Sequence, residues 1–253
     1  MVNMTRVIDW KGKIGYGDII SPICYAYNQA DILKEDVVLN FYFDHSKGTK
    51  FKDSDAETIN DRVDYINRNT VASSHKVIVN QIYNTKLECN HTNYSDKPLS
   101  YHNLRFSNVT WNGNGNHIAV VSSLRNKKKF SEYAKGKMWK DPLSNKWEEY
   151  IKKLSDEYNV KLIDYETPIS EASDIIASSK IVIGYHGSAM WLARWLSAPM
   201  IIYSDKSITK EVFPWCVHNP INVDLEKQKD MSLYLLDYHR RELKNYVESL
   251  HRI

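Results

Sequence analysis

Hydrophobic positions along the chain follow two different periods, which predict β-strands and α-helices in alternation. Short β-branched and aromatic runs predict strands over residues 6–10, 37–43, 76–80, 117–122, 160–164, 181–183 and 200–203. Between these runs apolar residues recur at helical spacing, which predicts helices over residues 19–33, 56–67, 144–158 and 188–196 and a loop entering a short helix over residues 168–177. Such alternation is typical of parallel sheets with right-handed crossovers. The expected fold class is therefore α/β, built from Rossmann-like units.

Turn-forming residues divide this pattern into two halves. The segment 112–116, in which asparagine and glycine alternate, is a concentrated turn signal. We expect an N-terminal Rossmann-like domain over residues 1–113, a second one over 114–230, and a closing C-terminal helix over 231–253. Doubly wound sheets bind ligands beyond the carboxyl ends of their strands. Two such sheets that face each other would leave a cleft suited to a substrate.

One strand–turn–helix segment in the second half has the residues of an anion site. The apolar run 181–183 ends at Gly184, and Ser188 is placed to cap the helix that follows. A helix N-terminus presents unpaired backbone N–H groups and a partial positive charge, which favour phosphate. Gly187 lets a ligand approach the backbone, and His186 adds a donor beside it. An ordinary strand-to-helix turn has the same pattern, so the rest of the chain must distinguish the two interpretations.

The composition is typical of a globular protein and does not indicate a particular ligand. Hydrophobic residues make up 42% of the 253 positions and charged residues 26%, which is a globular balance. No run approaches the ~20 apolar residues needed to span a bilayer, and the N-terminus lacks the pattern of a signal peptide. We therefore expect a cytoplasmic protein. The three cysteines lie far apart without the spacing of metal ligands, so neither disulfides nor a zinc site is expected.

Basic residues gather in predicted loops although the net charge is only +3. Lys47, Lys50 and Lys52 follow the second predicted strand, and Arg125 and Lys127 follow the strand over residues 117–122. A guanidinium at a strand end holds phosphate oxygens bidentately, whereas a lysine cluster is more often a solvated surface. The net charge by itself is too small to establish a nucleic-acid partner.

Three segments carry motifs in a defined order. Residues 15–22 read Gly-Tyr-Gly-Asp-Ile-Ile-Ser-Pro, residues 137–139 read Lys-Met-Trp, and residues 184–193 read Gly-Tyr-His-Gly-Ser-Ala-Met-Trp-Leu-Ala. The first resembles the Gly-x-Gly-Asp loop of the ADP-heptose lipopolysaccharide heptosyltransferases. The second is similar to the Lys-x-Trp segment of that family, and the third to its glycine loop before a helix. The motifs span both halves, so the resemblance covers roughly the whole chain.

The resemblance implies a GT-B glycosyltransferase, with the nucleotide-sugar donor on the C-terminal domain and the acceptor on the N-terminal one. The first-loop aspartate of the family is the general base, which carries over onto Asp18, although Asp18 also suits a helix cap. The acceptor-binding residues expected are Tyr16, Gly17, Lys47 and Lys50. The donor-binding residues expected from the motifs and from the strand ends are Arg125, Lys127, Lys137, Ser170, Glu171, His186, Gly187 and Ser188.

The expected function is inverting, metal-independent transfer of a sugar from a nucleoside-diphosphate sugar to a hydroxyl of an anionic acceptor. Uridine is the default nucleotide, and no cofactor beyond this co-substrate is expected. Inverting transfer needs a base for the acceptor hydroxyl and positive groups for the departing diphosphate. No Asp-x-Asp metal motif stands at a strand end.

The acceptor has two candidate classes. Lysines after the second strand suit phosphates, and a compact chain rich in Lys, Asn, Tyr and Ile favours DNA with hydroxylated or hydroxymethylated bases, as phages make in the host cytoplasm. Lipopolysaccharide or another surface glycan is the alternative. A non-catalytic module that binds sugar nucleotides or DNA, and a sugar-nucleotide epimerase on the same plan, also remain open.

Overall fold

Internal contacts divide the chain into two units in the computed structural model, and each unit is described by itself. The first unit holds Met1–Thr110, Pro168–Ser173 and Gly187–Ser197, and the second holds Trp111–Thr167, Asp174–His186 and Ala198–Ile253. The structure describes residues 5–12, 15–43, 53–83, 91–92, 105–121, 144–164, 167–185, 188–204, 221–222, 241, 244–245 and 248.

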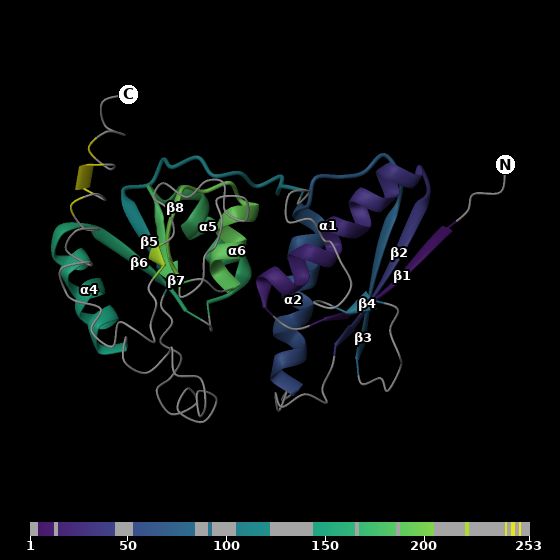
Figure 1. Ribbon diagram of the computed structural model, residues 1–253, viewed down its shortest axis with the longest axis horizontal. Coiled ribbons are helices and arrows are strands. Elements are labelled where there is room, and N and C mark those ends of the chain that lie inside the picture. The colour runs from purple at the N-terminus through teal and green to yellow at the C-terminus, as the bar shows by residue number, and fades with distance from the viewer. Residues whose placement is uncertain are drawn as a thin grey trace. The chain divides into compact units, whose positions relative to one another are not determined.

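The first unit contains a parallel sheet whose described strands are β1 (Thr5–Gly12), β2 (Asp36–Phe43), β3 (Val77–Tyr83) and β4 (His91–Thr92). Their order across the sheet is β3-β2-β1-β4, and each neighbouring pair is parallel. Helix α1 (Tyr16–Leu33) connects β1 to β2, and α2 (Asp53–Asn69) connects β2 to β3. Because both right-handed crossovers step in the same direction, both helices lie on one side of the sheet (Figure 1).

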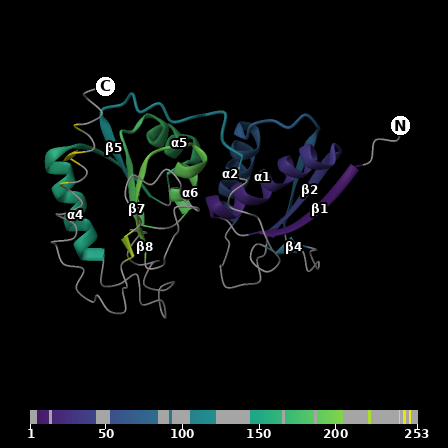
Figure 2. The same ribbon diagram turned by 45° about the horizontal axis from the view of Figure 1, so that its top comes forward.

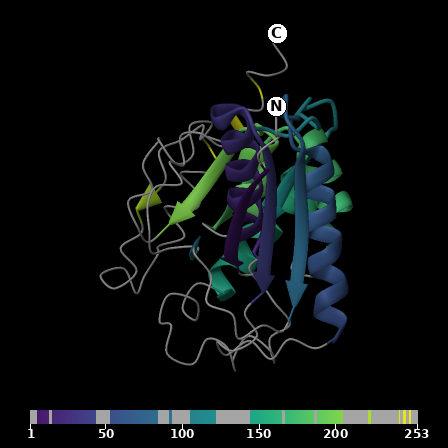
Figure 3. The same cartoon turned by 90° about the vertical axis from the view of Figure 1, so that its right-hand side faces the viewer.

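The two faces of this sheet differ because successive side chains of a strand point to opposite sides. The face toward the helices is apolar, and its β2 side chains are 0% exposed: Val37, Leu39 and Phe41. The other face carries a row of polar side chains in register. Asn40 Nδ2 donates to Asp9 Oδ1 at 2.9 Å, and Asn80 Nδ2 donates to Asn40 Oδ1 at 3.0 Å. Figure 3 looks at this unit from the side of β1 and β2.

The second unit contains a parallel sheet whose described strands are β5 (His117–Val121), β6 (Asn159–Ile163), β7 (Val182–Tyr185), β8 (Met200–Ser204) and β9 (Ile221–Asn222). Their order is β6-β5-β7-β8-β9, so the chain changes direction between β5 and β7, as in doubly wound sheets. Helix α4 (Ser144–Glu157) connects β5 to β6, and α5 (Ile169–Ser178) follows β6 on the other side of the sheet (Figure 2). The central strands are buried on both faces: Val120 and Ile183 on one face, and Ala119 and Val182 on the other, are each 0% exposed.

The hydrophobic pattern predicted the elements well. Each strand and helix expected up to residue 203 is present, and the α/β class with parallel sheets is confirmed. Helix α1 begins at Tyr16, earlier than the expected Ile19. Strands β4 and β9 were not expected, because a strand of two residues has no measurable period. Of the expected helix over 231–253, only positions 241, 244, 245 and 248 are described, and they are helical.

The division into units lies close to the turn at residues 112–116. It groups α6 (Ser188–Trp195) with the first unit, and α6 packs against α1. The boundaries expected from the sequence, at residues 113 and 230, remain predictions. No helix in the part of the chain that the structure describes is long and apolar enough to cross a membrane.

Candidate functional site

The first turn of α1 carries Asp18, the residue expected to act as a base. Gly15 is the N-cap, with extended backbone angles of φ −70° and ψ 149°. The Ile19 N–H donates to the Gly15 carbonyl at 3.1 Å, which closes the first turn. Asp18 therefore lies within this turn and is not the N-cap residue, which corrects the alternative that it simply caps the helix. Its carboxylate is half-buried, at the end of the helix where the dipole favours negative charge.

The two residues before Asp18 are held by neighbouring helices. Tyr16 is only 3% exposed, and the Arg62 guanidinium of α2 lies 4.6 Å from the centroid of its ring. A Cβ atom on Gly17 would lie 2.7 Å from Cγ of Trp191 in α6, so only glycine fits at this contact without a shift. The expected contacts of Tyr16 and Gly17 with an acceptor remain predictions.

Two arginines of the helices that contact this turn are almost completely buried, which the sequence pattern did not predict. Arg62 and Arg194 are each 4% exposed. The Arg194 guanidinium lies 5.4 Å from the centroid of the Trp191 ring, a distance at which a cation is attracted to an aromatic face. The available signal was a charged residue within an apolar helical stripe, since Arg194 stands between Ala193 and Trp195. Buried arginines are rare without such partners.

A polar network anchors the middle of α1 away from Asp18. Arg105 Nε donates to Asn28 Oδ1 at 2.9 Å, its Nη1 donates to the Ala72 carbonyl at 2.7 Å, and it forms an ion pair with Asp31. The Cys24 thiol donates to the Arg105 carbonyl at 3.5 Å, and burial raises the pKa of this thiol to about 12. A thiol that stays protonated at neutral pH is a poor nucleophile, so Cys24 has a structural role.

The expected donor side lies at the carboxyl edge of the second sheet. Val121, the last residue of β5, pairs with Gly184 in β7, so the loops after both strands leave the sheet at the same edge. This is also the place where the strand order reverses, which is where doubly wound sheets bind ligands. Ser188 is the first residue of α6. Ser170 and Glu171 are exposed in the first turn of α5.

The remaining expected site residues lie outside the residues that the structure describes. On the donor side these are Arg125, Lys127, Lys137, His186 and Gly187, and on the acceptor side Lys47 and Lys50. Their roles stay predictions. What the structure brings together is the first turn of α1, the middle of α2 at Arg62 and α6 at Trp191, within the first unit.

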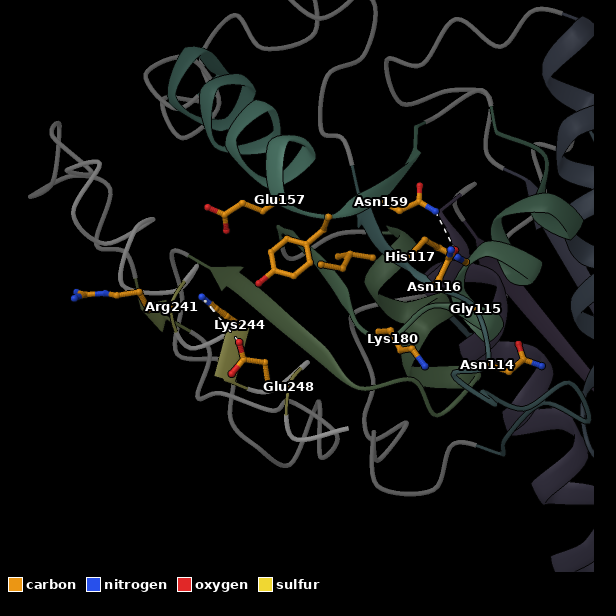
Figure 4. A pocket seen from close by; sticks show the side chains of 12 residues that line it. Asn114, Gly115, Asn116, His117, Glu157, Asn159, Lys180, Arg241, Lys244 and Glu248 are labelled. Carbon is orange, nitrogen blue, oxygen red and sulfur yellow. Dashed lines mark hydrogen bonds and ion pairs between the residues drawn. The ribbon is translucent and has the colours of Figure 1, made fainter. Parts of the chain in front are cut away.

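A cavity of about 800 Å³ lies at the opposite edge of the second sheet, beside the first residues of β5 and β6 (Figure 4). Several of its polar groups are already paired. Asn159 Nδ2 donates to Asn116 Oδ1 at 3.0 Å, and Lys180 Nζ donates to the Gly113 carbonyl at 2.8 Å. His117 Nε2 lies 2.9 Å from the Ile175 carbonyl, and burial lowers the pKa of this imidazole. The cavity contains none of the expected donor residues and faces away from the edge where such sheets bind ligands.

The described side chains offer no group of three or more His, Cys, Asp or Glu residues that could hold a metal ion. The side chains of the loops after β1, β2 and β5 lie outside this search.

Comparison with known proteins shows a likeness of fold to a solved structure. No protein-family model matches the chain. No curated protein sequence matches it either. Among solved structures, the chain is similar to the iron-containing dodecameric glycosyltransferase TibC from enterotoxigenic E. coli H10407, with a TM-score of 0.51 and 12% identity. The alignment covers 98% of this chain and 76% of TibC. The chain therefore shares the Rossmann-like α/β fold of a bacterial glycosyltransferase.

Proposed function

We propose that the chain is a glycosyltransferase that moves a sugar from a nucleoside-diphosphate sugar to a hydroxyl of an anionic acceptor. One observation carries the proposal: a half-buried carboxylate, Asp18, lies in the first turn of the helix after β1, in a chain with the fold of a glycosyltransferase. The likeness to TibC supports the class of fold, and the chemistry of Asp18 supports the reaction.

The proposed reaction is a single displacement with inversion. Asp18 takes the proton of the acceptor hydroxyl while the acceptor oxygen attacks the anomeric carbon of the donor. The bond between that carbon and the diphosphate oxygen breaks, and the nucleoside diphosphate leaves with the electron pair. Positive groups lower the barrier by stabilising this leaving group, and we assign that role to Arg125, Lys127, Lys137 and the loop 186–188 in place of a metal ion. Ser170 and Glu171 would contact the donor at the start of α5.

The proposal includes a GT-B arrangement, a uridine nucleotide as the default donor, and DNA with hydroxylated bases as the leading acceptor. Lys47 and Lys50 would contact acceptor phosphates, which position a nucleic acid without reading its sequence. The base hydroxyl would have to reach Asp18, which a duplex permits only if the base is flipped out of the stack. A surface glycan is the alternative acceptor.

Mass spectrometry tests the acceptor directly. The protein is incubated with uridine-, adenosine- and guanosine-diphosphate sugars together with plain DNA, hydroxymethylated DNA or lipopolysaccharide, and the digested products are weighed. A pentose or hexose gained only on hydroxymethylated nucleosides supports the proposal. A gain only on lipopolysaccharide replaces the acceptor class, and no gain with any combination overturns transfer to either acceptor.

The role of Asp18 has its own test. Asp18→Asn keeps the size of the side chain but removes the base, so turnover should fall by roughly 100-fold or more while the Kd for the donor stays nearly unchanged. Asp61→Asn is the matched control, because Asp61 is exposed on α2. Unchanged turnover in Asp18→Asn would falsify the assignment of the base. Loss of donor binding as well would indicate a binding role for Asp18.

A further inference from the structure

We propose that Trp191 positions the Asp18 carboxylate by fixing where the first turn of α1 lies against α6; the inference rests on the proposed function. Trp191 is thus a positioning residue, since it acts through the backbone of α1.

The contact joins the indole to the backbone of α1 at Gly17. A Cβ atom there would lie 2.7 Å from Trp191 Cγ, 2.8 Å from Cδ1 and 3.1 Å from Cδ2. Glycine inside a helix costs about 1 kcal/mol relative to alanine, and Gly17 has ordinary helical angles, without the positive φ that favours glycine. The close approach of Trp191 is therefore what requires glycine at this position.

The indole is itself held in place. The Arg194 guanidinium, one turn further along α6, lies 5.4 Å from the ring centroid. The residues on either side of Trp191, Met190 and Leu192, are 0% exposed, so α6 is fixed in the core by its other faces. The preceding residue of the turn is held as well, since the Arg62 guanidinium lies 4.6 Å from the ring centroid of Tyr16. The turn is thus held by α2 at residue 16 and by α6 at residue 17.

The position of Asp18 depends on the position of Gly17, the residue before it. Its Cα lies one peptide unit, about 3.8 Å, from that of Gly17, so any shift of Gly17 moves the base as well. A displacement of about 1 Å at a catalytic group can lower the rate about 100-fold. The expected donor residues lie outside α1, so a shift of this turn should lower kcat and leave KM for the donor unchanged.

Size changes on the two sides of the contact test the proposal. Gly17→Ala and Trp191→Ala should each lower kcat at least 10-fold with KM for the donor within twofold of wild type. The double variant should be no slower than Trp191→Ala, because the methyl group then has nothing to displace. Trp191→Phe retains Cγ and should keep kcat within about threefold. Additive losses in the double variant, or wild-type kcat in Trp191→Ala, would overturn the proposal.

A second measurement does not depend on activity. In protein labelled with ¹³C-aspartate, the chemical shift of the Asp18 carboxyl carbon should change in Gly17→Ala and Trp191→Ala. It should stay in place in Trp191→Phe and in Trp111→Ala, a matched variant that removes an indole from a glycine contact in the second unit. If wild type transfers no sugar but the shift moves as stated, the proposed function fails and the positioning stands. A shift that stays in place in Trp191→Ala overturns the positioning whatever the activity.

Discussion

Two glycine–tryptophan contacts, one in each unit, look alike and do different things. A Cβ on Gly17 would lie 2.7 Å from Cγ of Trp191, and a Cβ on Gly113 would lie 2.5 Å from Cζ2 of Trp111. Gly17 has helical angles, whereas Gly113 has a φ of +60°, in the left-handed region. Space alone requires glycine at the first position, while space and backbone conformation both require it at the second.

The partners of the two indoles also differ. The Trp111 Nε1–H donates to the Ser179 carbonyl at 2.7 Å, and the Gly113 N–H donates to the Ala177 carbonyl at 3.2 Å. This contact ties residues 111–113 to the end of α5, within the second unit, by directed hydrogen bonds. The Trp191 ring faces the Arg194 guanidinium and packs on a helix backbone. The contact between Trp111 and Gly113 should therefore affect mainly stability, and the contact between Trp191 and Gly17 mainly the geometry of the first turn of α1.

The largest expected effect on stability is that of Gly113→Ala. The left-handed φ and the overlap with Trp111 together should lower the free energy of unfolding by about 2–4 kcal/mol. Urea denaturation followed by tryptophan fluorescence measures this loss. The neighbouring Asn114→Ala is the control, because Asn114 is exposed and should change stability by less than about 0.5 kcal/mol. Equal midpoints for the two variants would contradict the contrast.

The next largest effect is a loss of stability at alkaline pH, which we expect from the buried Cys24 thiol of the first unit. The Cys24 thiol has an ordinary pKa of 9.0, and burial raises it to about 12 in the folded protein. Between these values the unfolded chain has lost the proton and the folded one has kept it, so the free energy of unfolding falls as pH rises. The slope approaches about 1.4 kcal/mol per pH unit, and the contribution is fully present below pH 9.0.

Cys24→Ser separates this titration from other alkaline effects. Serine can retain a donor toward the Arg105 carbonyl and does not ionise in this range. Urea midpoints measured from about pH 8 to pH 10 should fall more steeply for wild type than for the variant. Parallel pH profiles would show that the thiol is not protected by burial.

A smaller effect is expected for Trp111→Phe. Phenylalanine keeps an aromatic ring at the contact with Gly113 but leaves the Ser179 carbonyl without its donor, which should cost about 1 kcal/mol. Denaturation at neutral pH measures the loss. Trp191→Phe serves as the comparison, because it keeps the ring carbon nearest Gly17. If Trp111→Phe lowers the free energy of unfolding by no more than the error of measurement, the hydrogen bond to Ser179 does not distinguish the two contacts.

The smallest expected effect is a loss of stability in mild acid, caused by the buried imidazole of His117 in the second unit. Burial lowers the pKa of His117 below its ordinary value of 6.5, so the unfolded chain gains a proton first as pH falls. The contribution to stability is thus present above pH 6.5 and is lost as pH falls through the folded pKa. His117→Gln should flatten the decline of the urea midpoint between neutral pH and about pH 5. An unchanged decline would assign the acid sensitivity to other groups.

The candidate site was only partly accessible from sequence. Asp18 stood out because a motif and a strand end coincide there. Ser170 and Glu171, expected in a segment that leads into a short helix, lie within the first turn of α5, because a local pattern locates helix ends only to within a few residues. The burial of Arg62 and Arg194 escaped notice, because an arginine in an apolar stripe reads as a surface residue until its aromatic neighbour is known. Gly17 was assigned to acceptor binding from its motif, and its contact with Trp191 left no trace in the local pattern.

The sequence by itself determined the alternation of strands and helices, the parallel character of both sheets and the polar break at residues 112–116. These features depend on hydrophobic period and turn chemistry, which are properties of neighbouring residues. Only the tertiary structure decided the order of the strands and the packing of α6 on α1. It also brought Trp191 onto Gly17, a contact between positions more than half the chain apart. Such contacts depend on how buried surfaces fit together, and a local pattern carries no information about shape.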